Sequence, residues 1–276
     1  MKKILTLLFL LSMLNNTSKA QHNIHPPKSE KASFPLGIVN KIWSNQLSEE
    51  RTLNIYLPEG YDTSTKTYPV IYLLDGSANE DFIHITGIVQ FLTMIGAMPQ
   101  TIVIGIANVD RKRDFTFPTT IAQDKKDFPT TGSSEKFIRF IELDLIPFVQ
   151  QNCRVSSSTI IGQSLGGLLA TEILLKKPAL FDTYIIVSPS LWWDNESLLE
   201  KAPALLKSLP QRNITVYISA GNEGKIMEAD VLKLRDLLQQ ITNPYLKVFY
   251  SPEPEEDHLT ILHNCIYKAL KTLNKK

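Results

Sequence analysis

The sequence contains few cysteines and none of the short patterns that bind metals or nucleotides. Only Cys153 and Cys265 occur among its 276 residues, and CxxC, HExxH and phosphate-loop patterns are all missing. We therefore expect no metal and no nucleotide cofactor. In an oxidising compartment the two cysteines can pair, but two separate thiols fit the sequence equally well.

Clusters of one charge are also missing. The chain has 29 Lys and Arg residues against 28 Asp and Glu residues, so its formal net charge is +1. Without a basic patch it lacks the electrostatic footprint of a nucleic-acid binder, and we expect no such partner. Hydrophobic residues make up 43% of the chain and charged residues 21%, which excludes disordered and fibrous classes.

One long apolar run occurs, at the amino end. It covers residues 4–14, follows Met-Lys-Lys and precedes the small residues that end at Ala20. This order is typical of a secretory signal peptide. A membrane anchor is disfavoured, because a spanning helix needs about 20 apolar residues. We predict a signal peptide over 1–20, one domain over 21–276, and an exported protein, periplasmic or secreted, with no membrane span in the mature chain.

The rest of the chain alternates between strand and helix patterns. Residues 38–43 and 51–57 indicate a strand pair at a sheet edge. Short runs rich in Val and Ile indicate strands buried on both faces, at 70–74, 101–106, 159–161, 184–187, 215–219 and 246–250. Helical spacing occurs within 137–148, 165–173 and 231–238. We predict an α/β fold, a mostly parallel twisted sheet with helices on both faces, in which the long connections 110–134 and 191–210 build a binding site.

The most informative motif is Gly-Gln-Ser-Leu-Gly at 162–166. It follows an apolar strand and precedes an amphipathic helix, as a nucleophilic serine on a sharp turn does. Glycines on both sides leave room for strand and helix to approach, and the helix amino end stabilises developing negative charge. We predict that Ser164 is the nucleophile. The alternative is a Gly/Ser turn without chemistry.

A serine nucleophile needs a base, and in folds with this turn the order along the chain is serine, acid, histidine. Only His258 and His263 follow Ser164, whereas His22, His25 and His84 precede it. His258 lies in an acidic loop after the last strand, and His263 lies within the following helix. We predict that His258 is the base.

The acid is expected directly after the strand 215–219. Glu223 is the first carboxylate there, with Glu228 and Asp230 as alternatives. A Ser-His pair with a weak third member is also chemically possible. The oxyanion hole is predicted from the backbone N–H of Leu165, after the nucleophile, and that of Ser77, in the loop after the third strand.

Several segments resemble the Putative esterase family of α/β-hydrolases, which includes siderophore esterases, S-formylglutathione hydrolases and mycolyltransferases. They are YPVIYLLDG at 68–76, the serine turn at 162–167, the segment 105–114, and SPSLWW at 188–193. The last two are similar to the siderophore-esterase-like branch, and the resemblance covers nearly the whole mature chain. It implies an α/β-hydrolase fold with Ser164 and His258 as nucleophile and base. The acid departs from the family pattern, because Gly224 stands where relatives often carry the carboxylate.

Aromatic and basic residues in the long connections are candidate substrate contacts. Trp192 and Trp193 would line an acyl or aryl pocket, and Arg111 and Arg113 would bind an acidic substrate. Alternatively, one tryptophan is core packing and Arg113 is a structural partner of Asp114.

Taken together, these patterns predict an exported serine carboxylic ester hydrolase that works through an acyl-enzyme and needs no cofactor. Its partner is a small-molecule ester, either a siderophore or a sugar ester. Hydrolysis of S-formylglutathione is disfavoured, because those relatives are cytosolic. Two alternatives are an acyltransferase to a sugar or lipid alcohol, and a member of the fold that binds a ligand without catalysis.

Overall fold

The computed structural model describes residues 29–275. The predicted signal peptide, residues 1–20, lies outside this range. Residues 29–35 contain no helix or strand, and the chain from Leu36 onward forms one compact unit.

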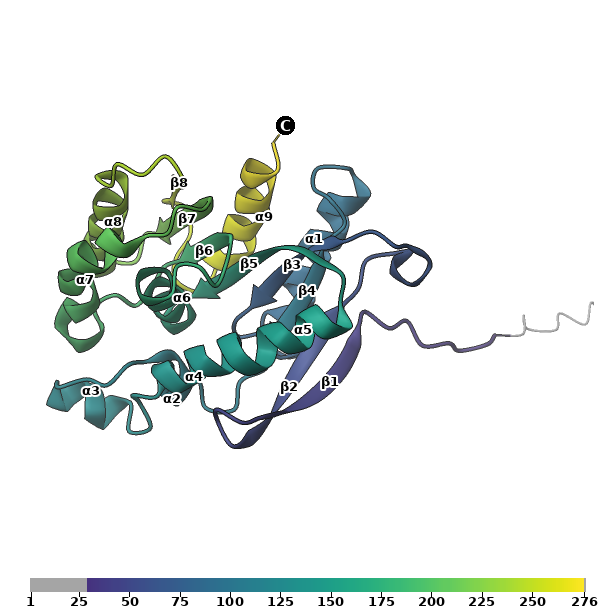
Figure 1. Cartoon of the computed structure of the whole chain (residues 1–276), viewed down its shortest axis with the longest axis horizontal. Helices are drawn as coiled ribbons and strands as arrows, with labels where there is room; N and C mark the ends of the chain where they lie inside the picture. Colours follow the sequence, from purple (N-terminus) through teal and green to yellow (C-terminus); the bar gives the residue numbers. More distant parts are fainter. Residues whose placement is uncertain (1–28, 276) are drawn as a thin grey trace, which may run out of the picture. The chain divides into compact units, whose positions relative to one another are not determined.

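The core of this unit is one sheet with the strand order β1-β2-β4-β3-β5-β6-β7-β8 (Figure 1). Its strands are β1 (Ile38–Ser44), β2 (Glu49–Tyr56), β3 (Tyr68–Leu73), β4 (Ile102–Ile106), β5 (Val155–Gln163), β6 (Thr183–Val187), β7 (Ile214–Gly221) and β8 (Leu246–Glu253). The pairs β1–β2 and β2–β4 are antiparallel, and the strands from β4 to β8 pair in parallel. The predicted fold class is therefore confirmed, with the antiparallel pair at one edge.

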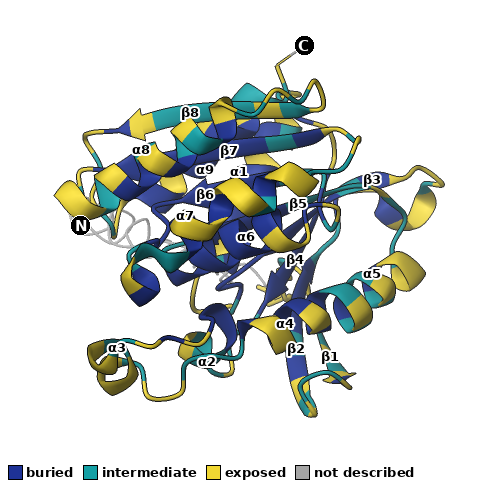
Figure 2. Cartoon of the chain, turned by 60° about the vertical axis from the view of Figure 1, so that its left-hand side comes forward, coloured by how far each residue is buried: buried dark blue, intermediate teal, exposed yellow. Residues whose placement is uncertain are grey.

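Helices cover both faces of the sheet (Figure 2). They are α1 (Phe82–Met94), α2 (Arg111–Phe115), α3 (Ala122–Asp127), α4 (Ser134–Phe140), α5 (Ile146–Asn152), α6 (Leu165–Lys176), α7 (Trp193–Leu205), α8 (Lys225–Gln239) and α9 (Ile261–Leu273). Alternate strand residues face opposite sides. Ile71 and Leu73 pack with α1 and α9, whereas Val70 and Tyr72 pack on the side of α4, α6, α7 and α8. Among residues 29–275, none of the helices has the length and apolarity that crossing a membrane requires.

Two segments differ from the sequence prediction. The helix predicted within 137–148 is present and extends from Ser134 to Asn152, but its middle turn, Ile141–Leu145, is π-helical between α4 and α5. The long connections 110–134 and 191–210 are not plain loops, because they contain α2, α3 and α7. The sequence does not show these helices by helical spacing. The helices α2 and α3 are only 5 and 6 residues long, and α7 is interrupted by left-handed residues near its start.

The two cysteines are free thiols. Cys265 on α9 is buried in the core on the α1 side, and Cys153, after α5, packs on the opposite side of the sheet. Of the two possibilities that the sequence left open, the structure therefore has separate thiols.

Three residues other than glycine have a positive φ where parallel strands end. Asp75 (55°) comes shortly after β3, Ser164 (58°) directly after β5 and Ser188 (44°) directly after β6. Such backbone conformations are strained for residues with a side chain, and they gather at functional sites. The carboxyl edge of the sheet is therefore the place to look for one.

Candidate active site

Ser164 lies on the turn between β5 and α6, with φ 58° and ψ −122°. Glycine is required beside it, because a Cβ added to Gly162 would lie 2.3 Å from the carbonyl oxygen of Gly166. The Ser164 N–H donates to the carbonyl of Val187 at 3.1 Å, which ties the turn to the end of β6. The close packing that the motif predicted is thus what holds the serine in its strained conformation.

The structure brings the three predicted triad residues together. Ser164 Oγ lies 3.0 Å from His258 Nε2, and His258 Nδ1 lies 2.6 Å from Glu223 Oε2. The three side chains follow β5, β8 and β7, so strand ends far apart in the sequence meet at one edge. The side-chain amide of Gln163 donates to the backbone carbonyl of His258 at 2.5 Å and fixes the histidine loop against the serine turn.

Glu223 is almost fully buried, with 2% of its side chain exposed. Its second oxygen accepts hydrogen bonds from the Ser188 hydroxyl and from the N–H of Gly221, the latter at 3.0 Å. Burial alone would raise the pKa of Glu223, but hydrogen bonds from His258, Ser188 and Gly221 outweigh it and lower the pKa below its ordinary value. An ionised Glu223 accepts a hydrogen bond from the Nδ1–H of His258, which leaves the Nε2 lone pair directed at Ser164.

The alternative acids do not contact His258. Glu228 accepts the backbone N–H groups of Glu223 and Gly224, each at 3.2 Å, at the amino end of α8. Asp230 is buried on α8, and burial raises its pKa to about 6. Gly224 has φ +89°, a conformation that favours glycine, so a carboxylate at that position would be strained. Glu223 is therefore the acid that the geometry supports.

His84 and His263, the two described histidines outside the triad, contact each other. His84 Nδ1 lies 3.2 Å from His263 Nδ1, and His84 Nε2 lies 3.1 Å from Asp81 Oδ1. This contact joins α1 to α9. Neither His84 nor His263 reaches Ser164 through any hydrogen bond in the described residues.

The loop after β3 is fixed by a bidentate ion pair. Arg111 binds both carboxylate oxygens of Asp75, at 2.6 and 2.9 Å, and Asn108 donates to the same carboxylate at 2.7 Å. Arg111 also donates to the carbonyl of Gln163 at 3.3 Å, and the Asn108 N–H donates to Ser77 Oγ at 3.2 Å. These contacts connect the predicted oxyanion loop to the serine turn. The roles of the Leu165 and Ser77 amides in an oxyanion hole stay predictions.

A cavity of about 370 Å³ opens beside the serine and histidine. It is lined by Asp75, Glu80, Asp81, Arg111, Gln163, Ser164, His258 and Leu259. A reacting ester placed there would meet a hydroxyl that is already hydrogen-bonded to an imidazole. This arrangement suits nucleophilic attack on a carbonyl group.

Comparison with known proteins agrees with this geometry. The sequence matches the model of the Esterase family, described as Putative esterase, over residues 44–248. The chain belongs to this family. As a member it is a carboxylic ester hydrolase with the α/β-hydrolase fold, and the predicted resemblance is confirmed.

Individual relatives of this esterase come from several bacteria. It is 31% identical over 248 residues to the ferri-bacillibactin esterase BesA of Bacillus subtilis (strain 168), covering 81% of this chain and 85% of the relative. An IroE-like serine hydrolase from Shewanella oneidensis superposes with a TM-score of 0.78 at 29% identity, covering 86% of this chain and 80% of that one. The BES protein from Bacillus cereus gives a TM-score of 0.80 at 26% identity, covering 91% and 100%.

Two predicted substrate contacts of the esterase lie elsewhere. Trp193 is fully buried, and its indole N–H donates to the carbonyl of Phe117 at 2.9 Å. Trp192 is half-buried and packs against the Phe128 ring, with centroids 6.1 Å apart. Neither lines the cavity beside Ser164. Trp193 is core packing, which is the alternative that the sequence left open, and a role of Trp192 in substrate binding stays a prediction. The Trp193 ring belongs to the buried core, and the Trp192 ring packs against that core from its partly exposed position.

The two arginines have different roles in the structure. Arg113 contacts its neighbour Asp114 on α2 at 2.7 Å and Glu49 at the start of β2 at 2.6 Å. It therefore acts as a structural partner and does not line the cavity. Arg111 does line the cavity, but its guanidinium is occupied by Asp75.

Sequence reasoning missed the residues that support the triad. Ser188 binds Glu223, and Ser190 Oγ lies 3.3 Å from Ser164 Oγ. Both belong to the segment SPSLWW that carried the family resemblance, and its position after a buried strand was the available signal. Gln163 occupies the variable position before the serine in the motif, so the sequence contains no sign of its contact with His258.

Proposed function

We propose that this esterase is an exported serine hydrolase that cleaves a small-molecule ester through an acyl-enzyme. The observation that carries the proposal is the continuous hydrogen-bonded chain from Ser164 Oγ through His258 to the buried Glu223. Export rests on the signal-peptide pattern at residues 1–20.

In the proposed mechanism, His258 Nε2 takes the proton of Ser164 as its Oγ attacks the ester carbonyl. The carbonyl oxygen becomes an oxyanion, which the N–H groups of Leu165 and Ser77 stabilise. His258 then gives its proton to the leaving alcohol, and Glu223 stabilises the charged imidazolium in between. Water, activated by the same histidine, releases the acid and restores the serine.

For the substrate we propose a siderophore ester or a sugar ester. The ferri-bacillibactin esterase among the relatives supports the first, because it matches most of this chain. Fold and triad determine the type of reaction, whereas the shape and charge of the cavity determine which ester is accepted.

The test is Ser164→Ala measured against a panel of p-nitrophenyl esters and a siderophore trilactone. We expect kcat to fall at least about 1,000-fold, because the nucleophile is lost while the fold is kept. A fluorophosphonate probe should label the wild type and leave the variant unlabelled. Ser156→Ala, an exposed serine on the same strand but at its other end, is the matched control.

Equal hydrolysis by wild type and Ser164→Ala would overturn the proposal. Product analysis in the presence of glycerol or a sugar separates hydrolysis from acyl transfer, since a transferase would form the new ester in preference to the free acid. Fractionation of cells that express the full chain, with loss of residues 1–20 from the exported form, checks the export.

A further inference from the structure

The cavity beside Ser164 has a one-sided charge. Of its lining residues, Asp75, Glu80 and Asp81 are acidic, and Arg111 is the one Lys or Arg side chain among those described there. Arg111 had been predicted from the sequence to attract an acidic substrate. The balance of charges in the structure indicates the opposite preference.

The charge of Arg111 is neutralised within the protein. Its guanidinium forms a bidentate pair with Asp75, in which 33% of the arginine side chain and 10% of the aspartate side chain are exposed. Burial alone would lower the pKa of Arg111, but the bond to Asp75 and the charges of Glu80 and Asp81 raise it above its ordinary value. Two acids therefore lie close to this arginine in addition to the one that binds it.

Glu80 and Asp81 supply the other two carboxylates of the lining. Glu80 contacts the Asn108 amide at 3.1 Å, and Asp81 contacts His84, also at 3.1 Å. Within residues 29–275 neither acid forms an ion pair with a lysine or arginine. After the pair of Arg111 and Asp75 is set aside, the lining holds two carboxylates and no further lysine or arginine.

A second group of acids lies in the histidine loop. Glu255, Glu256 and Asp257 directly precede His258, and Asp257 accepts the backbone N–H of Leu259 at 2.8 Å. Lys268, which faces this loop from α9, is bound to Glu253. These acids precede His258 and Leu259, which line the cavity, and clefts lined by one sign of charge concentrate ligands of the other sign.

We propose that this site selects esters by charge, in the order cationic, neutral, anionic, and that Glu80 and Asp81 set this order. The ester it binds best carries an ammonium or guanidinium group in its acyl or alcohol part. This inference rests on the proposed function, because it concerns the substrate of the same serine.

The test uses p-nitrophenyl esters whose acyl chains differ only at the end, with a trimethylammonium, a tert-butyl or a carboxylate group. A second series places the same groups on the alcohol, with acetate as the acyl part. We expect kcat/KM for the cationic ester to exceed that for the anionic ester by about tenfold or more at low ionic strength. The ratio should shrink toward one in about 1 M salt, where the screening length is about 3 Å.

The decisive variant is Glu80→Gln combined with Asp81→Asn, which should lower the ratio of cationic to anionic ester at least about threefold. The matched control is Glu59→Gln combined with Asp62→Asn. It removes the same charge from exposed positions at the other edge of the sheet, and the ratio should not move. The neutral ester serves as an internal reference, so the ratio does not depend on how much protein is folded.

A preference for the anionic esters, equal rates across both series, or a ratio that the double variant leaves unchanged would overturn the inference. Failure of the proposed function looks different, because hydrolysis of the neutral ester would then be missing or would persist in Ser164→Ala. Hydrolysis that depends on Ser164 but ignores substrate charge would overturn the charge selection alone.

Discussion

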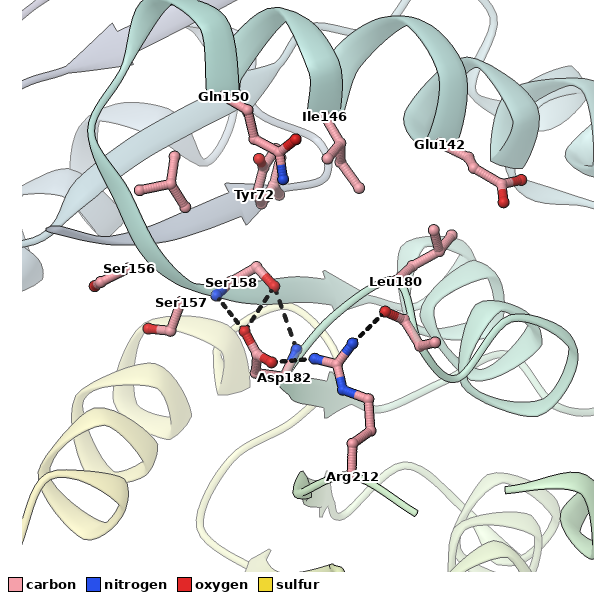
Figure 3. A pocket seen from close by; sticks show the side chains of 12 residues that line it. Tyr72, Glu142, Ile146, Gln150, Ser156, Ser157, Ser158, Leu180, Asp182 and Arg212 are labelled. Atoms are coloured by element: carbon pink, nitrogen blue, oxygen red, sulfur yellow. Dashed lines mark hydrogen bonds and ion pairs between the residues drawn. The ribbon is translucent and has the colours of Figure 1, made fainter. Parts of the chain in front are cut away.

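Each end of the parallel strands has a cavity, but only the cavity at the carboxyl ends lies beside reactive side chains. The larger cavity, about 520 Å³, lies at the amino edge, beneath α5 and beside the starts of β5 and β6 (Figure 3). There Asp182 accepts the N–H and hydroxyl of Ser158, at 2.8 and 3.0 Å, and also binds Arg212. None of the residues that line this cavity has a positive φ.

The cavity at the carboxyl edge is smaller than the one at the amino edge, but the backbone around it is strained. Asp75, Ser164 and Ser188 all have a positive φ there, and the Ser164 hydroxyl is hydrogen-bonded to a base. At the amino edge the polar groups bind one another, whereas at the carboxyl edge they converge on a point where a substrate can react. Convergent groups on a strained backbone therefore identify the site better than volume does.

Among the variants that test this difference between the two edges, Glu223→Gln is expected to lower kcat the most. A glutamine does not stabilise the charged imidazolium and can leave His258 with its proton on the wrong nitrogen, so kcat should fall about 1,000-fold or more. The control is Asp230→Asn, whose kcat should stay within about twofold of wild type. Steady-state kinetics at neutral pH measure both, and a larger loss in the Asp230 variant would mean that the acid was misassigned.

A smaller loss is expected from Asp75→Asn, because the asparagine leaves Arg111 without its bidentate partner and loosens the loop that carries Ser77. The expected decrease in kcat is about 10- to 100-fold, as for residues that hold reacting groups in place. Glu49→Gln breaks a comparable ion pair, to Arg113, away from the cavity and should keep its activity. Equal losses in both variants would indicate general destabilisation.

Asp230→Asn should change stability. Burial, followed by the charge of Glu196, raises the pKa of Asp230 from 3.8 to about 6. The folded wild type holds this proton more tightly than the unfolded chain, so its stability falls as the pH rises from about 4 to about 6. At pH 7 the variant should be more stable by about 1 to 2 kcal/mol, an advantage that disappears near pH 4. Urea unfolding at the two pH values measures this, and a less stable variant at pH 7 would contradict it.

The smallest effect is expected from Asp182→Asn at the amino edge. Its ion pair with Arg212 is partly exposed, with side-chain exposures of 40% and 37%, so its loss should cost only about 0.5 kcal/mol. Thermal unfolding and kcat/KM are the measurements, and kcat/KM should stay within about twofold of wild type. A tenfold loss of activity would show that the larger cavity takes part in the function and would remove the contrast between the edges.

The sequence predicted the elements whose residues repeat a simple pattern. Buried strands read as Val and Ile runs, and the serine turn was identified by its glycines. The start of β5 was missed, because Ser156 and its neighbours are polar residues at the partly exposed amino edge. Chain order then selected Ser164, His258 and Glu223, which the structure brings into hydrogen-bonding distance.

The remaining contacts depend on which strands lie side by side. Ser188 meets Glu223 because β6 pairs with β7, and Arg111 meets Asp75 because β4 pairs with β3. The local sequence pattern of a strand does not show which other strand lies beside it. For the same reason, residue type alone did not reveal that Trp193 points into the core while Arg113 forms an ion pair at the start of β2.

The separation of Cys153 and Cys265 by the sheet has a consequence for where the protein can fold. Within residues 29–275 the structure has no disulfide bond and is held together by packing, hydrogen bonds and ion pairs. Burial raises the pKa of the Cys265 thiol to about 12, so this sulfur stays protonated and unreactive in the folded protein. The fold therefore needs no oxidising medium to form a disulfide between Cys153 and Cys265.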